Sequence, residues 1–430
     1  MKKIKVGIIG FGTVGTGVVL CLMQNSSIIK SRIGIDLVLH KIADIDIEKS
    51  RGLQLDKNLL TTDAYSLINE VDIVVELVGG TTIAKEFVLK ALSLGKSVVT
   101  ANKALLAKHG NEIFATAEKS GADIYYEASV AGGIPIIKSL KEGLAGNTID
   151  KIYGILNGTC NYILTQMSQK NQSFEDALSK AQEFGYAEAD PTLDIDGYDT
   201  AHKISILASL AFGDWINLSS VYVEGIRNIS LSDINYAKEL GYSIKLLGIS
   251  KKVDDDIQVR VHPTMIPNSA IMASINDVNN GIFIEGNPVG GTLFYGRGAG
   301  MAATSSAVVA DIIDVARNLK HSSSRRVPGF TVDKHYSKFT PMPDIASRYY
   351  IKIDVTDEPG VIAKIATILG DEHISISSML QKEVSETSQP VPIVIVTHLT
   401  YEKNMISALS KIQNLPIVHT KINLIRIEDI

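Results

Sequence analysis

The sequence predicts an α/β protein that begins with a Rossmann-type, doubly wound parallel sheet. Three observations support this fold class. Short apolar runs alternate with helical patterns, the runs are continuously apolar, and a glycine-rich turn joins the first run to the first helix. A strand followed by a helix, repeated, is typical of a doubly wound sheet. Continuous apolar runs are typical of parallel strands that are buried on both faces.

The elements of this first part follow one another closely, and we assign it to a domain over residues 1–130. Strands are expected at residues 5–10, 37–44, 71–77, 97–102 and 122–130. Helices are expected at residues 13–24 and 82–94, and a third helix ends at about residue 120. Residues 25–34 are expected to form an extra loop before the second strand.

Beyond about residue 130 the pattern changes, which predicts a second, α+β domain over residues 131–320. Helices are expected at residues 134–144, 161–169, 173–184 and 197–212, and strands at 219–226 and 257–266. A helix at 302–319 is expected to pack back on the first domain, which would then include residues 302–320.

Residues 321–346 have the composition of a linker, because serines and prolines are concentrated there. The remaining residues, 347–430, predict the ferredoxin-like order βαββαβ. Its elements are expected at residues 348–355, 360–371, 374–380, 390–399, 402–412 and 421–428.

Composition excludes several classes of protein. The 430 residues are 45% hydrophobic and 21% charged, which is enough to build a core. The net charge of −5 argues against general nucleic-acid binding, which needs a basic surface. The two cysteines, Cys21 and Cys160, form no CxxC pattern, so we expect a reducing compartment with no disulfide framework and no zinc site. The uncharged residues 6–23 contain too many glycines for an apolar spanning helix, and we expect a cytoplasmic protein.

The glycine-rich turn predicts a dinucleotide site. Gly10, Gly12 and Gly15 fit the pattern G-x-G-x-x-G after a strand and at the start of a helix, with Thr13 and Val14 between them. The first glycine allows the tight turn, the second admits the pyrophosphate, and the third lets the helix pack on the strand. The helix N-terminus would then face the phosphates. The alternative is a glycine-rich turn that binds no ligand.

Asp44 ends the second strand, where an acidic residue bonds the ribose 2′-hydroxyl of NAD. Lys41 and Arg51 lie close enough in the sequence to accept the 2′-phosphate of NADP instead. We therefore expect the protein to prefer NAD over NADP. The alternative is that Asp44 only caps a turn and contacts no cofactor. Ligands of such sheets bind beyond the carboxyl ends of the strands.

Two further strand ends are expected to border the nicotinamide. Gly79 follows the third strand, and Thr100 and Lys103 follow the fourth. Lys103 is either a ligand-binding residue or an ordinary lysine on a helix surface.

The segment at residues 183–203 is expected to carry the chemistry. It contains Glu188, Asp194 and Asp199, followed by Lys203. Asp199 and Lys203 are spaced i, i+4 and share one helix face. Hydride transfer from an alcohol needs a proton acceptor, which Lys203 supplies if burial or Lys103 lowers its pKa. The acidic residues suit a substrate with an ammonium group.

This segment and its surroundings have three alternative interpretations. Asp199 and Lys203 would contribute little as an exposed ion pair. An EF-hand alignment places Lys203 where a bidentate glutamate belongs, which argues against calcium. Cys160 would support aldehyde oxidation through a thioester, but no histidine lies near it in the sequence.

The chain resembles homoserine dehydrogenase over essentially its whole length. Four motifs carry the resemblance: residues 10–18, 100–107, 157–164 and 183–213. The resemblance implies that L-homoserine and L-aspartate 4-semialdehyde are interconverted with NAD or NADP, in threonine, methionine and isoleucine biosynthesis. It assigns proton transfer to Lys203, homoserine binding to Glu188 and Asp199, and a place near the ammonium group to Asp194. It places Lys103 against cofactor or substrate, and Gly185, Gly298 and Gly300 against the cofactor.

The resemblance also implies a monovalent cation, Na⁺ or K⁺, at Glu127, Val130, Gly132 and Ile134. The alternative is a buried glutamate beside a glycine turn. One carboxylate with neutral oxygens suits such an ion better than a transition metal.

Residues 347–430 resemble an ACT domain, because Asp357 and Gly360 stand in a turn that leads into a helix. That module implies an amino-acid effector, with L-threonine as the natural expectation, and a homodimer or homotetramer. His373 and Ser375 stand in a region where many effector-binding copies carry asparagine, so the alternative is a role mainly in oligomerisation. Two other readings of the whole chain stay open: an amino-acid-sensing regulator that has lost catalysis, and another semialdehyde dehydrogenase that uses Cys160.

Overall fold

The computed structural model describes residues 2–331, 338–382 and 390–430. The chain forms two compact units, each built from three separate segments of the sequence. Unit 1 contains Met1–Leu156, His202–Ser219 and Asn279–Tyr336, and unit 2 contains Asn157–Ala201, Ser220–Val278 and Ser337–Ile430. The domain boundaries predicted at residues 130, 320 and 346 stay a prediction. The linker expected at 321–346 lies partly outside the described residues.

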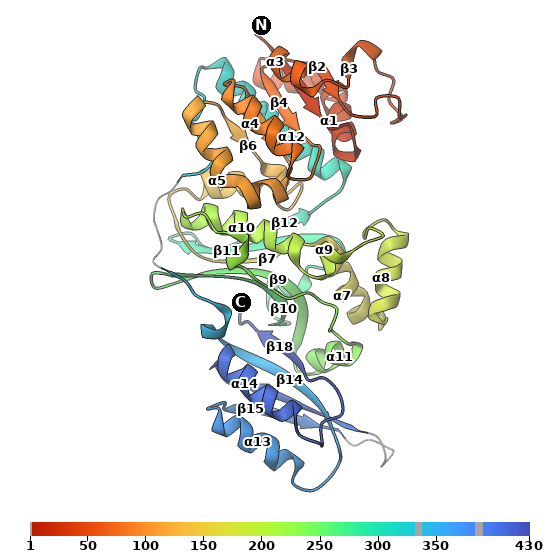
Figure 1. Ribbon diagram of the computed structural model, residues 1–430, viewed down its shortest axis with the longest axis vertical. Coiled ribbons are helices and arrows are strands. Elements are labelled where there is room, and N and C mark those ends of the chain that lie inside the picture. Colours follow the sequence, from red (N-terminus) through yellow and green to blue (C-terminus); the bar gives the residue numbers. More distant parts are fainter. Residues whose placement is uncertain (1, 332–337, 383–389) are drawn as a thin grey trace. The chain divides into compact units, whose positions relative to one another are not determined.

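Unit 1 contains a six-stranded parallel sheet in the order β3-β2-β1-β4-β5-β6 (Figure 1). The strands are β1 (Lys3–Ile9), β2 (Asp36–Ala43), β3 (Leu60–Thr61), β4 (Ile73–Glu76), β5 (Ser97–Thr100) and β6 (Ile124–Tyr125). This is the strand order of a Rossmann-type sheet, so the predicted fold class is confirmed. The order reverses between β1 and β4, and ligands of such sheets bind beyond the carboxyl ends of the strands at this point.

Helices cover the sheet because its central strands are apolar on both faces; Val6 and Ile8 of β1 are fully buried. The helices of this region are α1 (Thr13–Gln24), α2 (Ser26–Ile33), α3 (Ala64–Glu70), α4 (Ile83–Ser93), α5 (Lys103–Ser120) and α12 (Met301–Lys320). Helix α12 packs closely on α1, and a methyl group at Gly17 would lie 2.7 Å from Cγ of Met301. Val18 and Val308 belong to the same buried cluster.

The rest of unit 1 contains three antiparallel strands in the order β12-β11-β7. They are β7 (Thr148–Ile155), β11 (Asn279–Asn287) and β12 (Gly290–Arg297). Between β6 and β7 the chain forms a 3-10 turn at Glu127–Ser129, the short helix α6 (Ile136–Lys138) and a π-helical turn at Ser139–Gly143. Helix α10 (Tyr198–Phe212) begins in unit 2 and continues in unit 1.

Unit 2 begins with the helices α7 (Gly158–Lys170), α8 (Phe174–Glu183) and α9 (Thr192–Ile195), and later contains α11 (Leu231–Glu239). Strands β9 (Tyr242–Val253) and β10 (Asp256–Pro267) form a long antiparallel hairpin. Strand β8 (Tyr222–Val223) pairs in parallel with β10. Strand β13 (Lys338–Phe339) also pairs in parallel with β10.

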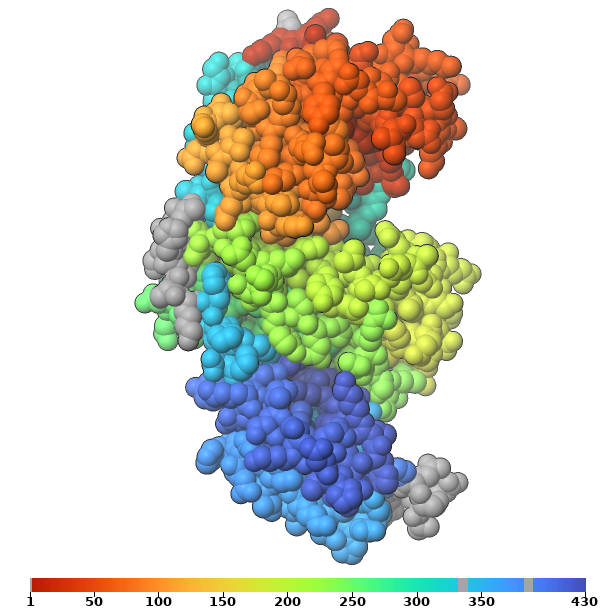
Figure 2. Space-filling model, in the orientation of Figure 1, coloured from red at the N-terminus to blue at the C-terminus, as the bar shows by residue number. Residues whose placement is uncertain are grey.

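The C-terminal module, residues 346–427, has the predicted order βαββαβ. Its elements are β14 (Ala346–Val355), α13 (Val361–Asp371), β15 (Ile376–Gln381), β16 (Val391–Thr397), α14 (Glu402–Gln413) and β18 (Asn423–Ile427), with the short strand β17 (Thr400–Tyr401). The sheet order is β18-β14-β16-β15, and the core includes Ile353, Leu369 and Ile412. In Figure 2 the blue surface of this module adjoins the green surface of the rest of unit 2.

Several sequence predictions were wrong in detail. Residues 25–34 are not a loop but contain α2, because Ile29 and Ile33 bury one face and Gly34 ends the helix with a φ of 63°. The strand expected at 122–130 is only Ile124–Tyr125, because Glu127 turns the chain. The helix expected at 134–144 is present, but it changes from α-helical to π-helical after Lys138 and ends at Gly143. The strand expected at 219–226 is only Tyr222–Val223. Strands β7, β9, β11 and β12 were not predicted as such, although β10 was.

In the part of the chain that the structure describes, no helix is long and apolar enough to cross a membrane.

Candidate active site

The glycine turn has the geometry that a pyrophosphate needs. Gly10 has a φ of 101°, and a methyl group there would lie 2.5 Å from the carbonyl oxygen of Leu77. A methyl group at Gly15 would lie 2.2 Å from the carbonyl oxygen of Gly10, so this glycine lets α1 pack on the turn. At Gly12 a methyl group would meet nothing within 4 Å. The space above Gly12 is therefore open at the N-terminus of α1, which begins at Thr13 and continues with Val14.

Asp44 and Arg51 are both anchored to the turn. The Asp44 carboxylate accepts hydrogen bonds from the backbone NH of Phe11 at 2.6 Å and of Asp46 at 2.9 Å. It also pairs with Arg51 at 3.3 Å. Arg51 Nε donates to the Phe11 carbonyl at 2.6 Å, and its guanidinium lies 4.6 Å from the centre of the Phe11 ring. Asp44 thus does cap a turn, and Arg51 rather than Lys41 is the cation beside it, since Lys41 donates to the Asn58 carbonyl.

A buried glutamate that sequence reasoning missed joins the ends of β4 and β5. Glu76 accepts hydrogen bonds from Thr100 Oγ1 at 2.7 Å and from the backbone NH groups of Val78 at 2.9 Å and Gly79 at 3.3 Å. Burial raises the pKa of Glu76, and these hydrogen bonds partly oppose the rise. Thr100 is itself buried, so its hydroxyl serves this network. A single acidic residue at the end of an apolar strand was the signal that could have identified it.

Lys103 is the first residue of α5 and is half-buried. Asn102 caps this helix by accepting from the Leu105 NH at 3.0 Å, and its amide donates to the Gly80 carbonyl at 2.7 Å. The carboxyl ends of β4 and β5 are therefore tied together at the place where the sequence expected Gly79, Thr100 and Lys103 to border a ligand.

Lys203 is not an exposed surface lysine. Its side chain is 8% exposed, and Nζ donates to the Leu156 carbonyl at 2.6 Å. Asp199 lies one turn earlier on α10 and is 5% exposed. The prediction that these two residues share a helix is confirmed, and the alternative of a solvated ion pair does not fit their burial.

Asn157 brings two of the predicted carboxylates together. Its Nδ2 donates to Asp194 at 2.7 Å and to Asp199 at 2.8 Å. Thr159 Oγ1 adds a hydrogen bond to Asp194 at 3.1 Å. Asn157 also caps α7, because its Oδ1 accepts from the Cys160 NH at 2.8 Å. Sequence reasoning did not single out Asn157, although an asparagine at the start of a helix was a readable signal.

Glu188 does not share the Asn157 amide with Asp194 and Asp199. Its side chain is exposed, and its backbone carbonyl accepts from Gln182 Nε2 at 3.1 Å. Gly185 follows α8 with a φ of 69° and is exposed. Glu188, Asp194 and Asp199 belong to unit 2, whereas Lys203 and the glycine turn belong to unit 1.

Cys160 is packed as a structural residue. It is fully buried in the first turn of α7, and its Sγ donates to the Asp194 carbonyl at 3.2 Å. A reactive cysteine needs access and a group that stabilises its thiolate. The thiol instead helps to hold the backbone of Asp194.

The second glycine turn leads into α12. A methyl group at Gly298 would lie 2.1 Å from Cγ of Asn280, and Gly300 has a φ of 108°. Gly132 packs on this turn, because a methyl group there would lie 2.5 Å from the Gly298 carbonyl oxygen. Both turns therefore depend on glycine.

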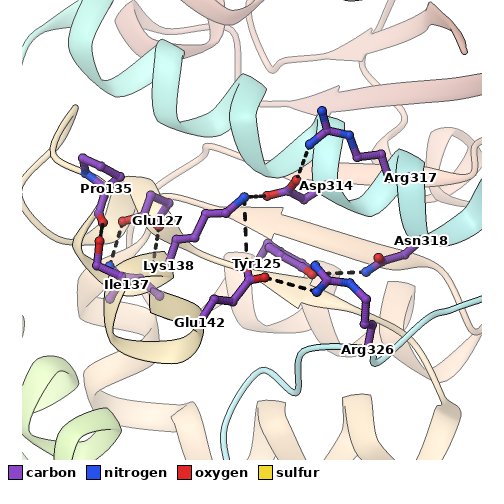
Figure 3. Close-up of polar contacts among 11 residues, drawn as sticks. Tyr125, Glu127, Pro135, Ile137, Lys138, Glu142, Asp314, Arg317, Asn318 and Arg326 are labelled. Carbon is purple, nitrogen blue, oxygen red and sulfur yellow. Dashed lines mark hydrogen bonds and ion pairs between the residues drawn. The ribbon is translucent and has the colours of Figure 1, made fainter. Parts of the chain in front are cut away.

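The residues expected around a cation form a tight buried turn. Ala131 and Gly132 both have left-handed backbones, with φ of 54° and 52°, between Val130 and Ile134. The two Glu127 oxygens accept from the NH groups of Ile137 at 2.8 Å and Lys138 at 2.7 Å, as Figure 3 shows. Burial raises the pKa of Glu127 to about 7 despite these bonds.

Glu127 is the acidic side chain of this turn, and the monovalent cation expected there stays a prediction. Among the described residues, no group of three or more His, Cys, Asp and Glu side chains is arranged to hold a metal ion.

In the C-terminal module, Asp357 is exposed and Gly360 has a φ of 90° at the start of α13. The predicted turn into a helix is therefore present.

Comparison with known proteins decides the family. Residues 135–313 match the homoserine dehydrogenase family model, residues 10–127 match the homoserine dehydrogenase NAD-binding domain, and residues 349–416 match the ACT domain. A homoserine dehydrogenase from Neisseria gonorrhoeae is 46% identical over 435 residues, with 100% of both chains covered. The chain belongs to the homoserine dehydrogenase family.

Solved structures agree with this assignment. A crystal structure of a homoserine dehydrogenase from Thiobacillus denitrificans is 45% identical with a TM-score of 0.93, and 100% of this chain and 99% of that chain are covered. A hyperthermophilic archaeal homoserine dehydrogenase in complex with NADPH is 28% identical with a TM-score of 0.63, covering 74% of this chain and 98% of the other. The C-terminal module is an ACT domain, and the chain has a nicotinamide cofactor domain. The alternatives of a regulator without catalysis and of a Cys160-dependent enzyme find no support.

Gly12 and Gly15 allow a matched test of cofactor binding at the glycine turn. Gly12→Ala should fold with unchanged stability, since nothing lies near the new methyl group, but should weaken NAD(P)H binding at least about tenfold by occupying the pyrophosphate space. Gly15→Ala should destabilise unit 1 by about 1–3 kcal/mol through the clash with Gly10. Thermal unfolding without cofactor and NAD(P)H fluorescence titration measure the two effects. Wild-type cofactor affinity in Gly12→Ala would contradict the assignment.

Proposed function

We propose that the chain converts L-homoserine reversibly into L-aspartate 4-semialdehyde, with Lys203 as the group that takes up and returns the proton. The observation that carries this is the buried Lys203, which follows Asp199 by one turn on α10 and is held by the Leu156 carbonyl. A buried amine on a rigid helix can exchange a proton with a substrate hydroxyl at a defined position.

The remaining roles follow from charge. Asp194 and Asp199 share the Asn157 amide, and their carboxylates are proposed to bind the substrate ammonium group together with Glu188. When homoserine is oxidised, Nζ of Lys203 takes up the hydroxyl proton. The nicotinamide, when bound, supplies the acceptor for the hydride that leaves the same carbon. In the reverse direction Lys203 returns its proton to the new alkoxide oxygen.

Oxidation of L-homoserine by the purified chain tests this function. We expect reduction of NAD or NADP that depends on homoserine, and a fall in kcat of about 10²- to 10⁴-fold in Lys203→Ala, as for loss of a general acid–base. Cofactor affinity should not change. Lys151→Ala, which removes a half-exposed lysine from unit 1, serves as the control. No turnover by wild type would contradict the function, and normal turnover by Lys203→Ala would contradict the role of that lysine.

Both cofactors are proposed to bind at Asp44 and Arg51. The Asp44 carboxylate suits the ribose hydroxyls of NAD, and the Arg51 guanidinium beside it suits the 2′-phosphate of NADP. The archaeal relative bound to NADPH supports the second cofactor.

Arg51→Ala should therefore separate the two cofactors. The KM for NADP should rise about tenfold, because a charged hydrogen-bond donor to the phosphate is lost. The KM for NAD should change much less, and it controls for any disturbance of Phe11. Equal changes in both KM values would contradict a phosphate-binding role.

A monovalent cation is proposed to bind the turn at Glu127, Val130, Gly132 and Ile134, where it would hold the backbone in its left-handed form. The dependence of the rate on Na⁺ or K⁺ at constant ionic strength tests this role.

The chain is also proposed to assemble as a homodimer or homotetramer, which sedimentation equilibrium measures.

L-Threonine is proposed as the effector of the ACT domain, at the turn that contains Asp357 and Gly360. Threonine should inhibit homoserine oxidation, and Asp357→Ala should keep the uninhibited rate but need a higher threonine concentration, because an exposed carboxylate is removed from the effector turn. Rates measured against threonine concentration for both proteins test this. An enzyme that is active but indifferent to threonine would leave the ACT domain a different role.

A further inference from the structure

A strand of the ACT domain is built into the sheet of the substrate-binding part of unit 2. Strand β18 lies between β14, with which it pairs antiparallel, and β10, with which it pairs in parallel (Figure 1). Arg426 is opposite Thr264 in this register, and the Glu428 NH donates to the Met265 carbonyl at 3.0 Å. Strand β18 therefore joins the ACT strands and the β9–β10 hairpin in one continuous sheet.

Arg426 is the centre of a buried ionic network on this strand. Its side chain is 2% exposed, and it pairs with two carboxylates, those of Glu224 and Glu402. Nε donates to Glu402 of α14 at 3.0 Å, and Nη2 also pairs with Glu402. Nη1 donates to Glu224 at 2.6 Å. The planar guanidinium thus joins an ACT helix to the segment that follows β8.

Two tyrosines complete the network. Tyr222 Oη accepts from Arg426 Nη2 at 3.1 Å and donates to Glu224 at 2.9 Å, and the Tyr222 ring centre is 5.1 Å from the guanidinium. Tyr349 Oη donates to Glu402 at 2.8 Å. Because each carboxylate has further donors, the positions of both acids are closely determined.

From Glu224 the chain runs directly to the turn that carries Asp194. The Ile226 NH donates to the Ile195 carbonyl at 2.8 Å, at the last residue of α9. A methyl group at Gly225 would lie 2.1 Å from that carbonyl oxygen, so the two backbones are in direct contact. Arg227 pairs with Asp196, the next residue. A displacement of residues 222–227 would therefore move the α9 turn.

We propose that Arg426 and Glu224 are positioning residues for the ammonium subsite: the ACT strand holds residues 222–227, these hold the end of α9, and α9 holds Asp194 against Asn157. The inference rests on the proposed role of Asp194 in binding homoserine. It assigns to the ACT domain a part in building the substrate site that is independent of any effector.

Glu224→Ala tests the proposal most directly, because Glu224 is 29% exposed and its loss is compatible with a folded chain. The KM for homoserine should rise about tenfold, the change expected when a well-placed hydrogen-bonding group loses its support. The kcat and the Kd for NADPH should stay within about twofold of wild type. Glu224→Gln, which keeps an acceptor for Arg426, should restore most of the affinity for homoserine. Glu239→Ala removes a carboxylate from an exposed ion pair of the same unit and should change none of these values.

Two further variants, Arg426→Gln and Asp194→Asn, distinguish a loss of positioning from a loss of the ammonium subsite itself. Arg426→Gln should raise the homoserine KM in the same direction, and Asp194→Asn measures the contribution of the subsite itself. In the double variant Glu224→Ala/Asp194→Asn, the two effects should not add, because both act through one carboxylate.

An unchanged homoserine KM in a folded Glu224→Ala enzyme would overturn the inference, as would equal losses in homoserine KM, kcat and cofactor affinity, which indicate general destabilisation. If Asp194→Asn leaves the KM unchanged, the proposed substrate role fails and the inference fails with it. If Asp194→Asn raises the KM but Glu224→Ala does not, only the inference fails.

Discussion

The shared amide of Asn157 is the interaction on which the arrangement of the two carboxylates proposed to bind substrate depends. Two carboxylates at one place repel each other, and Nδ2 relieves this by donating to Asp194 and Asp199 at once. The same side chain begins α7 with its Oδ1, so one residue relates the start of α7 to the turn at α9 and to the first turn of α10. A glutamine would have a longer side chain, and an aspartate would add a third negative charge, so neither fits this role.

One buried side chain also organises the carboxyl edge of the parallel sheet. Backbone NH groups and one hydroxyl from the ends of β4 and β5 converge on Glu76, a group that solvent does not reach. Buried polar groups are tolerated when they are satisfied, and a satisfied network specifies one backbone arrangement. The backbone at the carboxyl ends of β4 and β5 is thus held in place by one buried side chain.

The parts that the sequence predicted are those in which local pattern and burial agree. The buried parallel strands are continuous apolar runs, α1 has its glycine turn, and the ACT elements alternate clearly, so their positions were found within a few residues. Helix α2 was missed because only Ile29 and Ile33 bury it. Strands such as β12, whose residues are mostly exposed or half-buried, carry no apolar run to detect. The common helix of Lys203 and Asp199 was predicted from their spacing. The hydrogen bonds of Asn157, Glu76 and Arg426 were not, because their partners are distant in the sequence.

The interleaving of the two units has a consequence for synthesis on the ribosome. Unit 1 needs residues 279–336 in addition to the first 156, because α12 packs on α1 and β11 pairs with β7. Unit 2 needs the last strand of the chain, since β18 lies between β10 and β14. Domains usually fold in order as they emerge. Here the parallel strands are made early, but the face of α1 that α12 covers stays uncovered until residue 320 has been made, about three quarters of the chain. Chaperones that bind apolar surface therefore have an extended period in which to act on this face.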